Sequence, residues 1–550
     1  MEQEKSQIGA PRGVSRRRFL EIAGVGTVAG LGLGSSIRAG DAGAPPASGS
    51  PSADTGPLAK AGVSYNPTQA GTAPRHGGII MAGMPGDLVD FSPFETGVGR
   101  APWHHNLYTP LFYYDRNLNI VPGIAESYAI SDDKLTLTIK LSPRVKFHNG
   151  REFTAEDVAF NVRYALLPKT GGAARSLLQT CLGAIAVNKY TVQLKFRQPT
   201  AYVFDALTFM GMIAKESASE LRSRAVGTGP FAFERWIPGQ ELFLRRYENY
   251  WEPGLPYADA VRIRSFKDVA AMMLSFEAGE IDLVRSLPFS QVDRVRKQSD
   301  LLVIQPDNQP FYWNIYLNTK RKPFDNIKVR QALAWSINRQ AVIDSVLYGA
   351  SEVANTPIPK TSWAYEPDLQ KTYGFDLDRA RRLLKEGGIQ GGFQFTAVSS
   401  PIAAELTPIA IIWQQDLKKI GVDMKIVELS STDYAQRINT GDFEVMVSSS
   451  GRGHKDPGSL FRIQRQYFSG GNELGWQSKE YDDLVAKAAA EFDRARRKAM
   501  YRRIQQIILD ACFEIIIARN VILYAMRTTK LHDLRLETDE AWMLHRAWIS

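Results

Sequence analysis

Two basic side chains flank a glycine just before an Asp-Pro pair in the stretch MVSSSGRGHKDPGSLF, residues 446–461. Arg452 carries a planar fork of hydrogen-bond donors, which suits carboxylate and phosphate groups, and His454 stands on the other side of Gly453. This pattern favours a ligand that carries a carboxylate, a phosphate or many hydroxyl groups. The alternative is a solvated glycine-rich loop, because basic loop residues are usually exposed.

Recognisable hydrolase and metal motifs are absent from the sequence. It contains no G-x-S-x-G, no H-E-x-x-H and no C-x-x-C. His104 and His105 form the only adjacent pair among seven histidines, and in an extended segment their side chains diverge, so we expect one surface residue and one packing residue. No further ligands stand at metal-binding spacing. We therefore expect no catalytic residue, no metal and no cofactor.

The N-terminal segment has the features of an export signal. Residues 1–44 contain a basic region, a short apolar region and a small-residue region in that order. A twin-arginine pattern, S-R-R-x-F-L, is formed by Ser15, Arg16, Arg17, Phe19 and Leu20. The apolar region is too short and too rich in glycine to remain as a membrane span. We expect export of the folded chain by the twin-arginine translocase, with a cleavage site that the sequence leaves open.

The composition is that of a globular protein. Of the 550 residues, 44% are hydrophobic and 23% are charged. The chain after residue 39 has a net charge of +6 with both signs interspersed, so it lacks the basic stripe of a nucleic-acid-binding protein. Residues 45–75 are rich in Ala, Gly, Pro and Ser and are predicted to be a disordered linker. Cys181 and Cys512 could pair after export, but two buried thiols are the favoured interpretation.

Helical and extended patterns alternate through the rest of the chain. Residues 76–83 and 134–150 are predicted strands, and in the second Leu137 and Ile139 alternate with polar residues. Thr154 precedes a predicted helix with acidic residues in its first turn. Further helices are predicted at 325–347, 376–388, 408–421 and 478–511, and further strands at 422–429 and 443–450. Helices and strands mix without a strict repeat, which indicates an α/β or α+β chain in at least two lobes.

Four sequence blocks in a fixed order resemble the extracellular solute-binding proteins of family 5, which serve peptide and nickel-type ABC importers. The first block, residues 111–162, contains P-G-I-A-E-S, F-H-N-G and T-A-E-D-V. The second, 227–251, begins G-T-G-P-F and ends N-Y-W, one residue short of the family's N-x-Y-W. The others are residues 311–343 and the stretch YGFDLDRARRLLKEGG. The resemblance runs from about residue 76 to the end of the chain.

The resemblance implies a two-lobed α/β periplasmic binding protein fold, of class II and the large peptide-binding type, with a hinge and an interlobe cleft. Lobe I, with an extra subdomain, would comprise residues 76–308 plus 525–550, and lobe II residues 309–524. The implied function is capture of a small solute and its delivery to an ABC permease and ATPase complex in the inner membrane. We expect a periplasmic monomer that binds no nucleic acid.

The resemblance also implies where the ligand binds. Peptide-binding relatives hold the ligand's amino group with an Asp at the position of Gly453, so that anchor is missing here. The candidate ligand-binding residues are Trp103, Trp313, Asn314, Tyr434, Arg452, His454, Asp456 and Trp476. Each of the aromatic residues could instead serve only to pack a core. We expect a peptide-like, anionic or sugar-containing solute; a nickel or metal-chelate receptor, a secreted hydrolase and a chemosensory or chaperone-like module are the alternatives.

Overall fold

The computed structural model describes most of the chain from residue 63 onward. The described residues are 63–65, 67–68, 73–94, 102–169, 172–306, 309, 311–451, 455–537 and 541–550. The predicted export signal, including Ser15, Arg16, Arg17, Phe19 and Leu20, lies outside these residues. Within them, no helix combines the length and the apolar character needed to cross a membrane.

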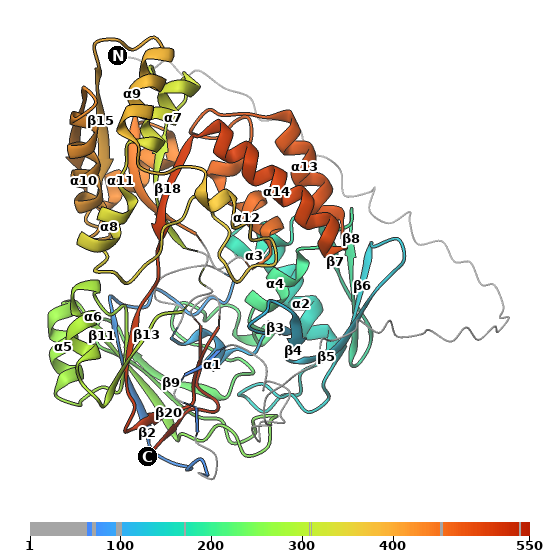
Figure 1. Cartoon of the computed structure of the whole chain (residues 1–550). Coiled ribbons are helices and arrows are strands. Elements are labelled where there is room, and N and C mark those ends of the chain that lie inside the picture. The colour runs from blue at the N-terminus through green and yellow to red at the C-terminus, as the bar shows by residue number, and fades with distance from the viewer. Residues whose placement is uncertain are drawn as a thin grey trace, which may run out of the picture. The chain divides into compact units, whose positions relative to one another are not determined.

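The largest sheet has seven strands, in the order β13-β19-β12-β2-β11-β10-β9. Figure 1 labels β2, β9, β11 and β13 of this sheet. Their bounds are β2 (Ile79–Pro85), β9 (Phe231–Ile237), β10 (Glu241–Arg246), β11 (Ala260–Phe266), β12 (Leu283–Arg285), β13 (Leu301–Ile304) and β19 (Tyr524–Arg527). β2 pairs in parallel with β11, and β19 runs antiparallel between β12 and β13. The chain therefore returns near its C-terminus to a sheet that it began near residue 79.

A second sheet has five strands, in the order β16-β15-β17-β14-β18. They are β14 (Tyr312–Leu317), β15 (Phe393–Ser399), β16 (Val422–Glu428), β17 (Val445–Ser450) and β18 (Glu514–Arg519). β14 and β18 are buried along their whole length, although β18 is an edge strand of this sheet. The helix α10 (Leu406–Lys418) packs against β15, β16 and β17.

A four-stranded antiparallel sheet carries the most regular strand pattern of the sequence. It has the order β5-β6-β8-β7, with β5 (Ala125–Ile130), β6 (Thr136–Leu141), β7 (Cys181–Asn188) and β8 (Thr191–Phe196). Leu137 and Ile139 are buried on β6 while their neighbours are more exposed, which confirms the predicted alternation. Thr154 forms a capping box with Asp157 at the start of α2 (Ala155–Leu166), so that predicted helix is confirmed.

Short elements complete the chain. The remaining strands are β1 (Val63–Tyr65), β3 (Phe112–Tyr114), β4 (Ile120–Pro122), β20 (Leu531–His532), β21 (Leu534–Leu536), β22 (Trp542–Met543) and β23 (Trp548–Ile549). The remaining helices before residue 400 are α1 (His104–Leu107), α3 (Gly172–Leu177), α4 (Val203–Phe209), α5 (Val269–Glu277), α6 (Val292–Arg296), α7 (Ile327–Trp335), α8 (Arg339–Ser345) and α9 (Leu377–Glu386). After it come α11 (Ser431–Thr440), α12 (Pro457–Ile463), α13 (Lys479–Ala490) and α14 (Arg494–Ala511), and four 3-10 turns lie at Lys215–Ser217, Phe289–Gln291, Leu369–Lys371 and Arg465–Tyr467.

Two predicted helices are each divided in the structure. The segment 325–347 forms α7 and α8, and Asn338 begins α8 by accepting a hydrogen bond from the amide of Ala341. The segment 478–511 forms α13 and α14, and Asp493 caps α14 by accepting from the amide of Arg496. Both predictions were wrong about continuity, because an N-capping side chain inside a helical pattern starts a new helix.

The two cysteines are unpaired. Cys181 and Cys512 are both buried, which confirms the favoured prediction of two buried thiols. Burial raises the pKa of each thiol to about 11. Both side chains therefore stay as thiols at neutral pH.

Gly227 allows two backbone segments to approach each other closely. A Cβ on Gly227 would lie 2.1 Å from the carbonyl oxygen of Leu107, so the segment after α1 can pack here only against glycine.

Candidate functional site

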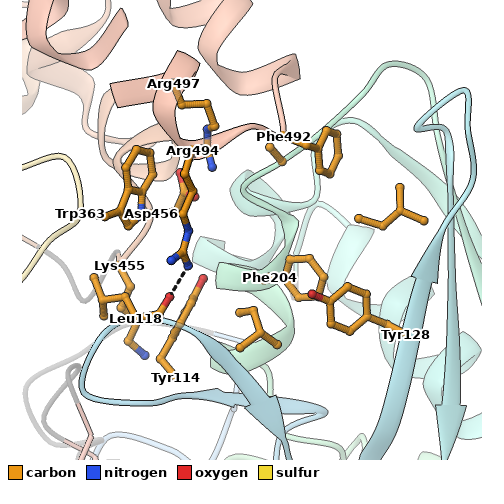
Figure 2. Close-up of a pocket in the computed structure, with 13 residues that line it drawn as sticks. Tyr114, Leu118, Tyr128, Phe204, Trp363, Lys455, Asp456, Phe492, Arg494 and Arg497 are labelled. Atoms are coloured by element: carbon orange, nitrogen blue, oxygen red, sulfur yellow. Dashed lines mark hydrogen bonds and ion pairs between the residues drawn. The ribbon is translucent and has the colours of Figure 1, made fainter. Parts of the chain in front are cut away.

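A pocket opens where the β3–β4 hairpin and β5 meet the segments that start α12 and α14 (Figure 2). Its volume is about 160 Å³. The lining residues are Tyr114, Leu118, Ile120, Tyr128, Ile130, Ala201, Phe204, Trp363, Lys455, Asp456, Phe492, Arg494 and Arg497. Aromatic and aliphatic side chains with a few convergent charged groups are the usual lining of a small-molecule site.

Aromatic rings form one wall of the pocket. Tyr128 on β5 packs against Phe204 of α4, with ring centroids 4.7 Å apart. Tyr128 is 44% exposed, so one edge of its ring remains open to a ligand. In Figure 2 these two rings and Phe492 face Tyr114 and Trp363 across the pocket. The arrangement can hold a flat or branched apolar group.

A buried hydrogen-bond network supports the floor of the pocket. The Tyr114 hydroxyl donates to Asp205 at 2.7 Å, and the amide of Asp456 also donates to the Asp205 carboxylate, at 3.1 Å. The Asp456 carboxylate in turn accepts from Arg497 at 2.5 Å and from the amide of Gly458 at 2.7 Å. Burial and the nearby charge of Asp456 raise the pKa of Asp205 to about 6. The network fixes the first turn of α12 and neutralises Arg497.

Lys455 lies beside this network in a second buried ion pair. Its ammonium group is 2.7 Å from the Glu537 carboxylate, and both side chains are almost fully buried. The same ammonium lies 5.5 Å from the centre of the Tyr114 ring. A buried ion pair has lost its hydration, so each member depends on the other. Lys455 therefore joins the start of α12 to the C-terminal segment of the chain.

Arg494 is the exposed cation of the pocket. It is the first residue of α14, and its guanidinium donates to the carbonyl oxygen of Leu118 at 2.7 Å and to the Asn119 side chain at 3.0 Å. Both acceptors belong to the β3–β4 turn and both are neutral.

The break between α13 and α14 places Phe492 and Arg494 at the pocket. The sequence pattern had predicted a continuous helix through this stretch.

Of the candidate ligand-binding residues that the structure describes, Asp456 alone lines this pocket. Arg452 and His454 lie outside the described residues. Trp103 packs edge-on against Phe91 at 5.5 Å, and Trp476 stacks on Phe513 at 4.3 Å.

The other three candidates lie on or beside the five-stranded sheet. Trp313 is buried on β14. Asn314 on the same strand donates to Glu514 at 2.6 Å. The hydroxyl of Tyr434 donates to the carbonyl oxygen of Val447 at 2.8 Å. The indole N–H groups of Trp103 and Trp313 are buried without a hydrogen-bond acceptor in the described part of the chain.

The expectation for the histidine pair was wrong. His104 and His105 belong to α1 and are both buried, with ring centroids 4.9 Å apart. A helical turn, unlike an extended segment, lets neighbouring rings tilt toward each other in a packed core. The described residues contain no group of three or more metal-binding side chains, so the pair is not extended into a metal site there.

Sequence reasoning missed most of the pocket. Tyr114, Tyr128, Phe204, Trp363 and Phe492 were not singled out, because isolated aromatic residues carry no site signal. Arg494 had a usable signal: Asp493 is a good N-cap directly before it, and a helix start at that point separates Phe492 from the preceding helix.

Comparison with known proteins agrees with this architecture. A di/tripeptide-binding protein of Pseudomonas aeruginosa (strain UCBPP-PA14) is 28% identical over 492 residues, covering 82% of this chain and 90% of the relative. The glutathione-binding protein GsiB of Escherichia coli (strain K12) is 28% identical over 419 residues, covering 73% and 81%. The oligopeptide-binding protein AppA of Bacillus subtilis, solved with a nonapeptide, aligns with a TM-score of 0.74 and 25% identity over 87% of this chain and 100% of AppA.

Solved structures that align with this chain, AppA among them, have the two-lobed α/β fold of periplasmic binding proteins, which confirms the predicted fold class. A family model described as "Bacterial extracellular solute-binding proteins, family 5 Middle" matches residues 119–472, well over half of the chain. The chain belongs to the family 5 bacterial extracellular solute-binding proteins.

Proposed function

We propose that this protein is the periplasmic receptor of an ABC importer. It captures a small solute between two lobes and hands it to an inner-membrane permease and its ATPase, and it catalyses no reaction. Family membership supports the receptor role, since the relatives found are solute-binding proteins. We take residues 76–308 plus 525–550 as lobe I and residues 309–524 as lobe II.

The observation that carries this proposal is the composition of the pocket. Leu118, Tyr128 and Phe204 come from the stretch assigned to lobe I, whereas Trp363 and Arg494 come from lobe II. A ligand favours the closed form only if it interacts with both lobes, because binding shifts the equilibrium by its differential affinity for the two states. A pocket with contributions from both stretches meets that requirement.

The ligand is a small solute that is peptide-like, anionic or sugar-containing. The ligands for which the relatives are named, di/tripeptides and glutathione, support a compound with peptide character and a carboxylate. Trp103 and Trp313 remain candidate donors to the ligand, because their buried indole N–H groups have no acceptor among the described side chains and backbone groups. Asn314, Tyr434, Trp476 and the segment with Arg452 and His454 stay candidate positions.

Native mass spectrometry of the mature protein, purified from the periplasm, tests the proposal. We expect a discrete adduct whose mass, measured after denaturation, identifies the solute. A panel of peptides, sugars and organic acids, read by thermal shift, provides the second measurement. An apo mass together with no thermal shift for any compound would refute the receptor role, as would turnover of a bound compound.

The export route has a separate test. We expect the double variant Arg16→Lys, Arg17→Lys to accumulate in the cytoplasm, because the twin-arginine pair is the recognition element of that pathway. Cell fractionation followed by immunoblotting measures the exported fraction. Unimpaired export of the double variant would remove the proposed signal.

A further inference from the structure

The volume of the pocket limits what it can hold. About 160 Å³ is available to a ligand between Tyr128, Phe204 and Phe492 on one side and Tyr114 and Arg494 on the other. An apolar cavity of about 150 Å³ accommodates one benzene ring. The pocket therefore fits a single ring or a branched aliphatic group, and a whole peptide would have to extend beyond it.

One of the cations around the pocket has no carboxylate partner among the described residues. The lining contains the cations Lys455, Arg494 and Arg497 and the carboxylate Asp456. Asp456 neutralises Arg497 and Glu537 neutralises Lys455, in both cases within buried ion pairs. Arg494 forms no ion pair with any carboxylate of the residues that the structure describes. Arg494 thus carries, at the exposed edge of the pocket, a positive charge that no described carboxylate neutralises.

Arg494 retains donors for a ligand. A guanidinium group has five N–H donors, and the bonds to Leu118 and Asn119 use two of them. Its planar fork matches a carboxylate better than it matches a hydroxyl or an amide. Because both present acceptors are neutral, no charge on the protein competes with an incoming carboxylate for this group.

We propose that this pocket is a carboxylate subsite: Arg494 binds the carboxylate of the ligand, and the adjoining apolar group, about one ring in size, packs against Tyr128, Phe204 and Phe492. The inference rests on the proposed receptor function and names the chemistry of its ligand. A free small carboxylic acid and the C-terminal residue of a peptide both present a carboxylate next to such a group.

Two pairs of probes test the subsite. Benzoate and its neutral isostere benzamide represent the free acid, and the dipeptide Gly-Phe and its C-terminal amide represent the peptide. Dissociation constants are measured by isothermal titration calorimetry for the wild type, Arg494→Gln and Arg496→Gln. Arg496 is the matched control, because it is an exposed arginine on the same helix turn that is paired with Glu491.

We expect at least one acid to bind about tenfold more tightly than its neutral partner, equivalent to about 1.4 kcal/mol. In Arg494→Gln this preference should fall to near unity, whereas Arg496→Gln should keep it. A purely structural role of Arg494 at the β3–β4 turn would weaken the acid and the neutral probe equally. Preference for Gly-Phe over benzoate would assign the carboxylate to a peptide, and the reverse to a free acid.

Three results would overturn the subsite. The first is equal binding of each acid and its neutral partner to the wild type, and the second is an unchanged preference in Arg494→Gln. The third is that none of the four probes binds. The receptor function would survive all three results if native mass spectrometry still detects a bound solute, so the two failures can be told apart.

Discussion

Glu514 should make the stability of the protein depend on pH. It is the first residue of β18 and is buried, and it accepts hydrogen bonds from the Tyr467 hydroxyl at 2.7 Å and from Asn314 at 2.6 Å. Burial raises the pKa of its carboxyl group from 4.5 to about 7, although both hydrogen bonds act in the opposite direction. Folding therefore favours the protonated form of this side chain.

The sign and size of the effect follow from the two pKa values. The stabilisation is complete below the unfolded pKa of 4.5 and is lost as the pH rises through the folded pKa of about 7. With about 1.4 kcal/mol for each pKa unit, Glu514 should cost the native state about 2.5 kcal/mol more at about pH 8 than at about pH 5. Glu514→Gln removes the charge and should abolish this difference.

Guanidinium unfolding of wild type and Glu514→Gln across this pH range measures the effect. The free energy of unfolding of the wild type should fall by about 2.5 kcal/mol relative to the variant as the pH rises. Exposed Glu220→Gln serves as the control for the loss of a carboxylate. Fluorescence and circular dichroism must report the same transition, because two lobes can unfold separately. A constant difference between wild type and Glu514→Gln at every pH would refute the reasoning.

Two further predictions concern packing. Lys455→Met should lower the free energy of unfolding by about 3–5 kcal/mol, because it removes the cation of a buried ion pair. In denaturant titrations, adding Glu537→Gln to this variant should recover part of the loss. If the effects of the two substitutions on the free energy of unfolding simply add, the two side chains are not coupled. Gly227→Ala should destabilise by about 3 kcal/mol, since its Cβ would meet the Leu107 carbonyl oxygen. Gly391→Ala, which has open space around it, is the control in thermal melts.

Local elements of the fold could be predicted because their signals are local. Alternation around Leu137 and Ile139 identified β6, and Thr154 identified the start of α2. The breaks before Asn338 and Asp493 were missed, because helical periodicity continues on both sides and only the capping side chains reveal them. The two-lobed architecture was predicted from the order of the sequence blocks that resemble family 5, because no single helix or strand pattern indicates how the lobes are arranged.

The pocket could not be predicted in the same way. Tyr114 and Arg494 lie hundreds of positions apart in the sequence, and only the folded chain brings them to one surface. Asp456 was found because its Asp-Pro pair belongs to a recognisable segment. Arg494 looks like an ordinary solvated arginine until its partners are known, and those partners turn out to be neutral groups of a distant turn.

The unpaired cysteines have a consequence for where the chain can fold. Cys181 and Cys512 are its only cysteines, and both are buried as free thiols. The native state therefore requires no oxidant, and a reducing cytosol is no obstacle to reaching it. If the twin-arginine signal acts as proposed, the receptor can complete its fold before it meets the membrane, and its two buried thiols stay unpaired in the folded chain when it reaches an oxidising compartment.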